Sequence, residues 1–532
     1  MIIKLIVLFC FFAVMIGVGI ACRRSARDVA GFVLGGRGVG SWLTAFAYGT
    51  SYFSAVIFVG YAGQFGWKYG VASTWIGLGN AFFGSLMAWS VLGRRTRILT
   101  QHLDSATMPD FFGRRFASPA LRTAASVIVF IFLIPYTASL YNGLSRLFGM
   151  AFGIDYAWCV IGMAVLTAVY VLLGGYLATA VNDFIQGIIM LFGIVAVIAA
   201  VLSANGGGMQ ALSALSQLPS GQSPPISGVF VSFFGPEPLE LLGVVLLTSF
   251  GTWGLPQMVG KFYAIRDEGS IAKGTVISTA FAFVVAGGCY FLGGFGRLYA
   301  GGIDLTPMGT PVYDSIIPAM LSGLPEILLG IVVILVLSAS MSTLSSLVLT
   351  SGSTMVLDIF GPLMERAGRR LNEHAHVFLI RVFVVFFIAV SAAIAIVQAK
   401  SAVTFIAQLM GISWGALAGA FLAPFLYGLY WKRATAAAVM VNFAVGVGIM
   451  CLCMACRFAG VPFINAFFSS PINAGVLAMA AGLAVVPLVS FVTKTPGEGV
   501  VDGMFSCYDR RIVVRATNAL PDAEDAGSAE RS

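Results

Sequence analysis

The stretch GTSYFSAVIFVGYAG, residues 49–63, lies inside an apolar run that is long enough to cross a bilayer. Its first half carries Thr50, Ser51, Tyr52 and Ser54. A helix in lipid must satisfy its own backbone, and glycine with small hydroxyl side chains loosens that hydrogen-bond ladder. Such a break is tolerated only around a cavity or a site. The stretch therefore predicts a membrane helix that is interrupted next to a binding site.

Long apolar runs of this kind fill the chain of 532 residues, of which 59% are hydrophobic and 10% are charged. A hydrocarbon core of about 30 Å requires roughly 20 apolar residues in a helix. The sequence therefore predicts an all-α, polytopic membrane protein with about thirteen transmembrane helices. The expected spans lie near residues 3–21, 40–62, 73–93, 120–147, 157–175, 184–203, 240–260, 275–296, 324–350, 378–397, 404–430, 434–455 and 472–492.

The lysines and arginines predict the orientation of the chain. With an odd number of spans the termini lie on opposite sides, and 24 of the 30 basic residues fall in alternate loops and the tail on one side. Cytoplasmic loops carry the excess of lysine and arginine. We therefore expect the N-terminus outside and the C-terminus in the cytoplasm, in the inner (plasma) membrane of the cell. The net charge of +8 then reflects topology and contact with anionic lipid rather than nucleic acid.

A second interruption is predicted in the seventh span, where TSFGTWGLPQ places Gly251, Gly254 and Pro256 close together. Proline removes a backbone donor and clashes with the preceding turn. The two interrupted spans are five apart, which is typical of transporters with a five-plus-five inverted-repeat core. Close helix packing by small residues is the alternative. The predicted divisions are 1–39 (first helix and cytoplasmic loop), 40–203 (first repeat), 204–430 (second repeat), 431–492 (two peripheral helices) and 493–532 (a cytoplasmic tail, disordered at its end).

The ninth span is unusually rich in hydroxyl side chains, with the sequence LSASMSTLSSLVLTSGST. Ser342 and Thr343 are adjacent and can both line a pocket at the shoulder of the helix. The carbonyl of Ala339 adds a third hard oxygen on that side. Hard oxygens without net charge suit a small monovalent cation, and opened carbonyls from the broken second span complete the shell.

Charge is nearly absent from the expected spans, and Asp183 in GGYLATAVNDFIQ is a clear exception. It lies at the cytoplasmic start of the sixth span. An acid in the first turn of a helix complements the helix dipole. Alternatively, the same carboxylate lies at the cytoplasmic mouth of a cation path and contacts the cation as it leaves. Both interpretations stay open.

Seven sequence motifs between Phe32 and Thr435 resemble the sodium:solute symporter family, which includes sodium/proline, pantothenate, acetate and sodium/glucose carriers. They are FVLGGRGVGSW, TSYFSA, MPDFFGRRF, YVLLGGYLATAVNDFIQ, GLPQMVGKFYA, LSASMSTLSS and MGISWGALAGAFLAPFLYGLYWKRAT. The resemblance implies the five-plus-five fold and one sodium ion between the first and eighth core helices. The implied ligands are the carbonyls of Thr50, Phe53 and Ala339 and the hydroxyls of Ser342 and Thr343. The proline carriers have an aspartate where this chain has Tyr52, and the Tyr-Phe-Ser-Ala pattern is closer to the pantothenate-like branch.

These features predict a sodium-coupled secondary active symporter that imports a small organic solute by alternating access. The expected solute is a carboxylate, such as a monocarboxylate or pantothenate, or an amino acid such as proline. A transporter-like sensor or receptor and a proton-coupled carrier of the same fold are the alternatives. A channel is disfavoured because no ring of charge lines a pore. An enzyme is not expected, since the chain has three histidines, none of them in a span.

The solute pocket is expected beside the two interruptions, without a buried cation or anion. A carboxylate would then be met by hydroxyls, helix N-termini and the sodium ion itself. No cofactor is expected apart from the coupling ion. The predicted pocket residues are Ser51, Tyr52, Ser54, Tyr136, Thr252 and Trp253.

Overall fold

The computed structural model describes residues 2–219, 227–306, 309–399, 406–460, 470–495 and 497–509. Within these ranges the regular structure is helical, and the strand pairing amounts to two isolated bridges. Three predicted features fall at least partly outside the described residues. They are the end of the tail, the centre of the loop at 204–237 and the start of the eleventh span.

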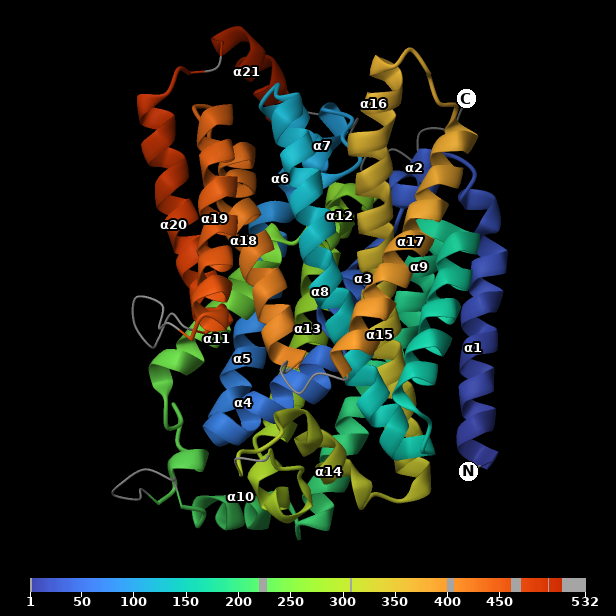
Figure 1. Ribbon diagram of the computed structural model, residues 1–532, viewed down its shortest axis with the longest axis vertical. Helices are drawn as coiled ribbons and strands as arrows, with labels where there is room; N and C mark the ends of the chain where they lie inside the picture. Colours follow the sequence, from blue (N-terminus) through green and yellow to red (C-terminus); the bar gives the residue numbers. More distant parts are fainter. Residues whose placement is uncertain are drawn as a thin grey trace, which may run out of the picture.

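The helices form one elongated bundle, and most of the long ones run between its two ends (Figure 1). The long helices are α1 (Ile2–Cys22), α8 (Pro119–Phe152), α9 (Tyr156–Ala204), α13 (Glu268–Gly293), α15 (Glu326–Thr354), α17 (Glu373–Ala399), α18 (Ile406–Tyr430), α19 (Ala436–Phe458) and α20 (Pro471–Val492). The shorter ones are α2 (Val29–Leu34), α3 (Ser41–Tyr52), α4 (Ala62–Tyr69), α5 (Thr74–Gly79), α6 (Arg94–His102), α7 (Met108–Arg115), α10 (Gly208–Ser216), α11 (Pro238–Phe250), α12 (Pro256–Ala264), α14 (Ile316–Ser322), α16 (Gly361–Arg366) and α21 (Glu498–Phe505).

Large apolar side chains cover much of the outside of the bundle. A soluble protein rarely exposes so many, whereas a bilayer solvates them. The prediction of an all-α, polytopic membrane protein is confirmed by these helices and their apolar exterior. The most exposed examples include Phe9, Trp158, Phe192, Val276, Phe378, Val397 and Val492.

The expected count of thirteen spans is not reproduced as thirteen separate helices. Ten described helices are long and apolar enough to cross a membrane, or eleven with one bent pair. Two of the ten, Val56–His102 and Tyr156–Ala204, are 47 and 49 residues long, and each merges parts of two expected spans. A helix of that length measures about 70 Å, more than twice the hydrocarbon thickness. The difference from thirteen therefore arises where consecutive spans continue into one another without a loop.

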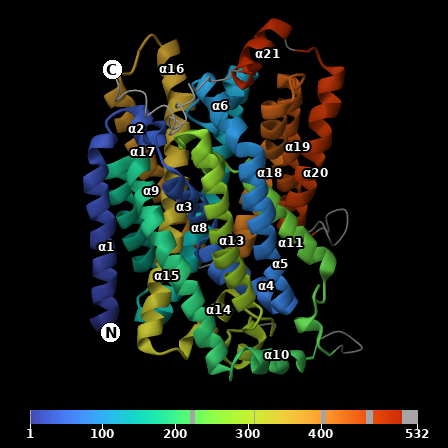
Figure 2. The same ribbon diagram turned by 180° about the vertical axis from the view of Figure 1, so that it is seen from behind.

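The chain turns within α9 at Gly175, between the fifth and sixth expected spans. This residue has φ 55° and ψ −148°, a conformation that a residue with a Cβ rarely adopts. A Cβ there would also lie 2.9 Å from the carbonyl oxygen of Phe32. The second half of α9 then runs back to the end of the bundle that holds α10 (Figure 2).

Both predicted interruptions are confirmed, and they have nearly the same backbone geometry. After α3 the chain becomes extended at Phe53, with φ −83° and ψ 124°, before the π-helical turn Val56–Tyr61. After α11 and the 3₁₀ turn Gly251–Gly254, Leu255 is extended with φ −88° and ψ 118°. Pro256 accounts for the second break, because a residue that precedes proline is driven out of the helical region. The two parts of this span are bent by 46°.

The beginning of α1 and the helix α21 lie at opposite ends of the bundle (Figure 1). This arrangement agrees with the expected odd number of crossings. The end that carries α21 also carries α2, α6, α7 and α16 (Figures 1 and 2). The assignment of this end to the cytoplasm stays a prediction from the distribution of lysine and arginine.

Candidate functional site

The interruption of α3 faces the middle of α15, where the five predicted sodium ligands come together. The hydroxyl oxygen of Ser342 lies 3.1 Å from the carbonyl oxygen of Thr50 and 3.0 Å from that of Ala339. The hydroxyl oxygen of Thr343 lies 3.3 Å from the Thr50 carbonyl and 3.1 Å from that of Ala339. It also lies 3.3 Å from the carbonyl of Phe53. All five residues are buried.

The carbonyl oxygens at this point outnumber the hydroxyl hydrogens that face them. Four lie within 3.5 Å of the Thr343 hydroxyl oxygen, those of Thr50, Ser51, Phe53 and Ala339. A hydroxyl has one hydrogen to donate. Because α3 ends here, its last carbonyls also lack the amides that a continuing helix would supply. A cluster of surplus neutral oxygens can bind a hard monovalent cation.

Tyr52 packs into an aromatic cluster with the predicted Tyr136 and with Trp414, which the sequence analysis missed. The ring of Trp414 in α18 lies between the rings of Tyr52 and Tyr136, with centroid distances of 5.7 Å and 6.0 Å. The side-chain amide of Asn80 donates a hydrogen bond to the Tyr52 hydroxyl. Ser54 lies in the short link after α3 and is completely buried. The available hint was a tryptophan among small residues in GISWGALAG.

The second interruption contributes one of its two predicted residues to this region. Thr252 and Tyr52 line the same small cavity. Trp253 makes its described contacts elsewhere, because its indole N–H donates to the carbonyl of Phe83 at 3.0 Å and its ring packs against Phe250 at 5.5 Å. The structure therefore brings Thr252 to Tyr52, and it places the Trp253 side chain against Phe83 and Phe250.

A buried ion pair lies next to Ser51, so the expectation of a pocket without a buried cation or anion is wrong. The Ser51 hydroxyl lies 2.9 Å from that of Ser346, to which the Lys261 ammonium donates at 2.9 Å. The same ammonium nitrogen lies 3.6 Å from a carboxylate oxygen of Asp183. The seventh expected span ends at residue 260, so the sequence predicts Lys261 in the cytoplasmic loop that follows. Lys261 instead belongs to α12, which follows the break at Leu255 and packs into the interior of the bundle.

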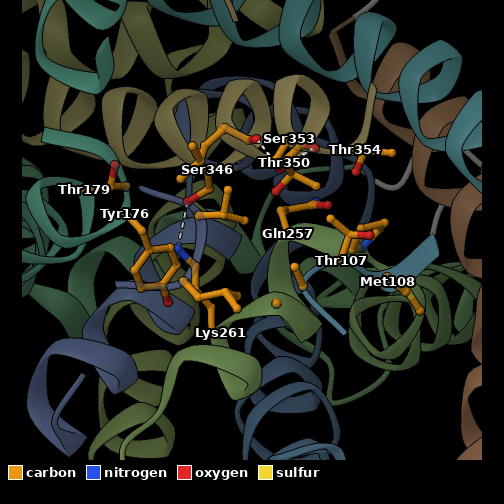
Figure 3. Close-up of a pocket in the computed structure, with 16 residues that line it drawn as sticks. Thr107, Met108, Tyr176, Thr179, Gln257, Lys261, Ser346, Thr350, Ser353 and Thr354 are labelled. Atoms are coloured by element: carbon orange, nitrogen blue, oxygen red, sulfur yellow. Dashed lines mark hydrogen bonds between the residues drawn. The ribbon is translucent and has the colours of Figure 1, made fainter. Parts of the chain in front are cut away.

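A cavity of mixed polarity reaches Lys261 from the end of the bundle that carries α2 and α7 (Figure 3). Its lining comes from α2, α7, α9, α12 and α15. Lys261 and Tyr176 lie at one side of it, and the Lys261 ammonium is 5.3 Å from the centre of the Tyr176 ring. Gln257, Ser346, Ser353 and other polar side chains line the remainder. The cavity therefore approaches the proposed ligand cluster through Ser346 and Ser51.

The interrupted membrane helices, with neutral oxygens gathered at one of them, define a transporter of the multi-pass, helical class. A sequence model of the Sodium:solute symporter family matches residues 32–446, and the chain belongs to this family. The family assignment from the sequence motifs is thereby confirmed.

Relatives align over almost the whole chain. The osmoregulated proline transporter OpuE of Bacillus subtilis (strain 168) is 28% identical over 502 residues, which cover 92% of this chain and 94% of that protein. A sodium/proline symporter of Staphylococcus aureus is 26% identical over 510 residues, with coverages of 92% and 93%. A solved structure of a Na⁺-coupled sialic acid symporter, in a substrate-bound outward-open state, superimposes with a TM-score of 0.72 at 16% identity. It covers 93% of this chain and 99% of its own, so the two proteins share a fold.

Proposed function

We propose that the protein couples the inward movement of sodium to the uptake of a small organic solute by alternating access. The observation that carries this proposal is the cluster of neutral oxygens between the end of α3 and the middle of α15. Sodium would be bound by the carbonyls of Thr50, Phe53 and Ala339 and by the hydroxyls of Ser342 and Thr343. Interrupted helices of this kind provide backbone oxygens at the centre of a membrane without exposing them to lipid.

We place the solute beside the sodium ion, next to the ring of Tyr52. The lining of this solute pocket would include Tyr136, Thr252 and Trp414, which supply apolar ring faces and hydroxyl groups. This environment suits a compact solute with an apolar body and few polar groups. A carboxylate or an amino acid meets that description, and the relatives named as proline carriers support an amino acid such as proline.

The sodium leaves toward the cytoplasm past Asp183 in this scheme. The two five-helix repeats, residues 40–203 and 204–430, would provide the moving parts, since each begins with an interrupted helix. Movement of one repeat against the other opens the site alternately to the two sides of the membrane.

The experiment is uptake into proteoliposomes that contain the purified full chain. A panel of labelled proline, pantothenate and short monocarboxylates is tested with an inward sodium gradient, an inward proton gradient, or neither. We expect uptake of one of these solutes under the sodium gradient, and counterflow of the labelled solute in sodium without any gradient. Uptake driven by protons alone would favour the proton-coupled carrier. Binding of the solute without counterflow would favour the sensor.

A further inference from the structure

Asp183 and Lys261 form a charged pair whose side chains are almost completely buried. The side chains are 0% and 3% exposed, and the nearest oxygen–nitrogen distance is 3.6 Å. Neither carboxylate oxygen of Asp183 has a hydrogen-bond partner among the described residues. Among the described residues, Lys261 is therefore the charge partner of a carboxylate that is otherwise poorly satisfied, and removing a partner from such a pair is costly.

The pair lies beside the route from the proposed sodium site to the cavity of Figure 3. Thr343 contacts the carbonyl of Ser51 at 3.5 Å, and the Ser51 hydroxyl leads through Ser346 to Lys261 in two steps of 2.9 Å. Lys261 itself lines the cavity. A cation that moves from the ligand cluster into the cavity along these oxygens therefore comes next to the Lys261 ammonium at Ser346.

We infer that Lys261 is a tethered counter-cation of Asp183. A sodium ion on its way to the cytoplasm displaces the Lys261 ammonium from the carboxylate, and the ammonium then expels the ion when it returns. This inference rests on the proposed function. The buried carboxylate requires one positive charge, and two cations at the same carboxylate repel each other. The ammonium is attached to α12 and is thus present at an effective concentration in the millimolar range or above.

The physical consequence is that sodium does not remain at Asp183. A lone buried carboxylate on the exit route would bind the ion tightly and slow its release. Competition from the tethered ammonium weakens that binding. The Ser346 hydroxyl accepts a hydrogen bond from the ammonium and can keep it while the ion is at Asp183. If the pair had only a structural role, removing it would change the stability of the protein without changing the inhibition of uptake by internal sodium.

The test measures how sodium inside proteoliposomes inhibits solute uptake in the wild type and in Lys261→Met. Internal sodium is titrated against choline at constant ionic strength, with a fixed external sodium concentration. We expect the internal sodium concentration that halves uptake to fall at least about tenfold in Lys261→Met, because Asp183 then holds the ion without competition. Lys68→Met is the matched control, since Lys68 also pairs with a carboxylate, that of Glu240 at 3.4 Å. Its internal sodium dependence should equal that of the wild type.

Two further variants keep the inference testable if Lys261→Met does not fold. The double variant Asp183→Asn with Lys261→Met removes both charges, and we expect it to lose the added sensitivity to internal sodium. In Lys261→Arg the guanidinium can donate two hydrogen bonds to the Asp183 carboxylate and competes more strongly with sodium. Inhibition should therefore require more internal sodium than in the wild type. Unchanged inhibition in Lys261→Arg, or equal inhibition in the wild type and Lys261→Met, would overturn the inference. Failure of the proposed function looks different, because the wild type itself would then show no sodium-driven uptake.

Discussion

Replacing Thr343 with valine removes one of the five proposed sodium-ligand oxygens and keeps the shape of the side chain. The side chain is completely buried, and its hydroxyl lies within 3.3 Å of three of the proposed carbonyl ligands. A contact between a hydroxyl and a charged group contributes about 1.5 to 3 kcal/mol, so the bound state loses that amount. The ion-free state also loses a neutral hydrogen bond to these carbonyls, about 0.5 to 1.5 kcal/mol.

The difference between these two losses sets the expected effect on sodium affinity. It amounts to about 1 to 1.5 kcal/mol, which corresponds to a roughly five- to thirteenfold weaker binding of sodium. Since binding of the ion and of the solute is linked reciprocally, the apparent affinity for the solute should fall at low sodium and recover at high sodium. The assay is solute uptake into proteoliposomes across a sodium titration in a potassium background.

The matched control is Thr50→Val. The Thr50 hydroxyl is also buried, but it has no hydrogen-bond partner among the described residues, and its carbonyl, the proposed ligand, remains in the variant. Sodium dependence should therefore stay within about twofold of the wild type. The assignment of the ligands is refuted if Thr343→Val keeps the wild-type sodium dependence, or if Thr50→Val loses as much affinity as Thr343→Val.

Three further outcomes are expected. In a cysteine-free background, Gln217→Cys should react with an impermeant reagent from outside and Glu365→Cys only after permeabilisation, and the opposite pattern would reverse the orientation. Trp414→Leu should weaken solute binding at least about tenfold and change sodium binding little, because its ring packs between two tyrosine rings, and equal losses in the two titrations would move the solute elsewhere. Gly49→Ala should lower the melting temperature of the purified protein, since its Cβ would lie 2.4 Å from a phenylalanine ring and overpacking costs about 1 to 3 kcal/mol. Gly448→Ala, also within a helix but with open space around it, should not lower it, and a similar loss in both variants would contradict the packing argument.

The interruptions were predictable because local chemistry causes them. Pro256 forces the residue before it out of the helix, and at the other break the Ser51 hydroxyl donates to the backbone carbonyl of Ala47. The hydroxyl cluster on α15 was predictable because many hydroxyl side chains, Ser342 and Thr343 among them, gather in the second half of this helix. These features depend on a few neighbouring residues, which the sequence displays directly.

Other features depend on tertiary packing and could not be predicted in the same way. Lys261 follows a break and precedes a loop that carries Arg266 and Asp267, so its sequence context is that of a solvent-exposed residue, yet α12 packs inward and buries it. Trp253 was expected in the pocket because it lies at the second break. Its ring instead packs against Phe250 and its indole N–H donates to the carbonyl of Phe83, contacts that depend on how the neighbouring helices pack. The expected fifth span ends at Gly175, where the chain does turn, but the hydropathy pattern did not show that the next helix follows there without a loop.

The neutral character of the oxygen cluster has an electrical consequence. Three carbonyls and two hydroxyls carry no formal charge, and the charges of Asp183 and Lys261 cancel. With one ion bound, the protein therefore differs from its ion-free form by a full positive charge, on which a membrane potential of 100 mV acts with up to about 2.3 kcal/mol. Uptake of a zwitterion with one sodium ion should generate a current, whereas uptake of a singly charged carboxylate should be electrically silent. The return of the empty protein should be insensitive to voltage in both cases.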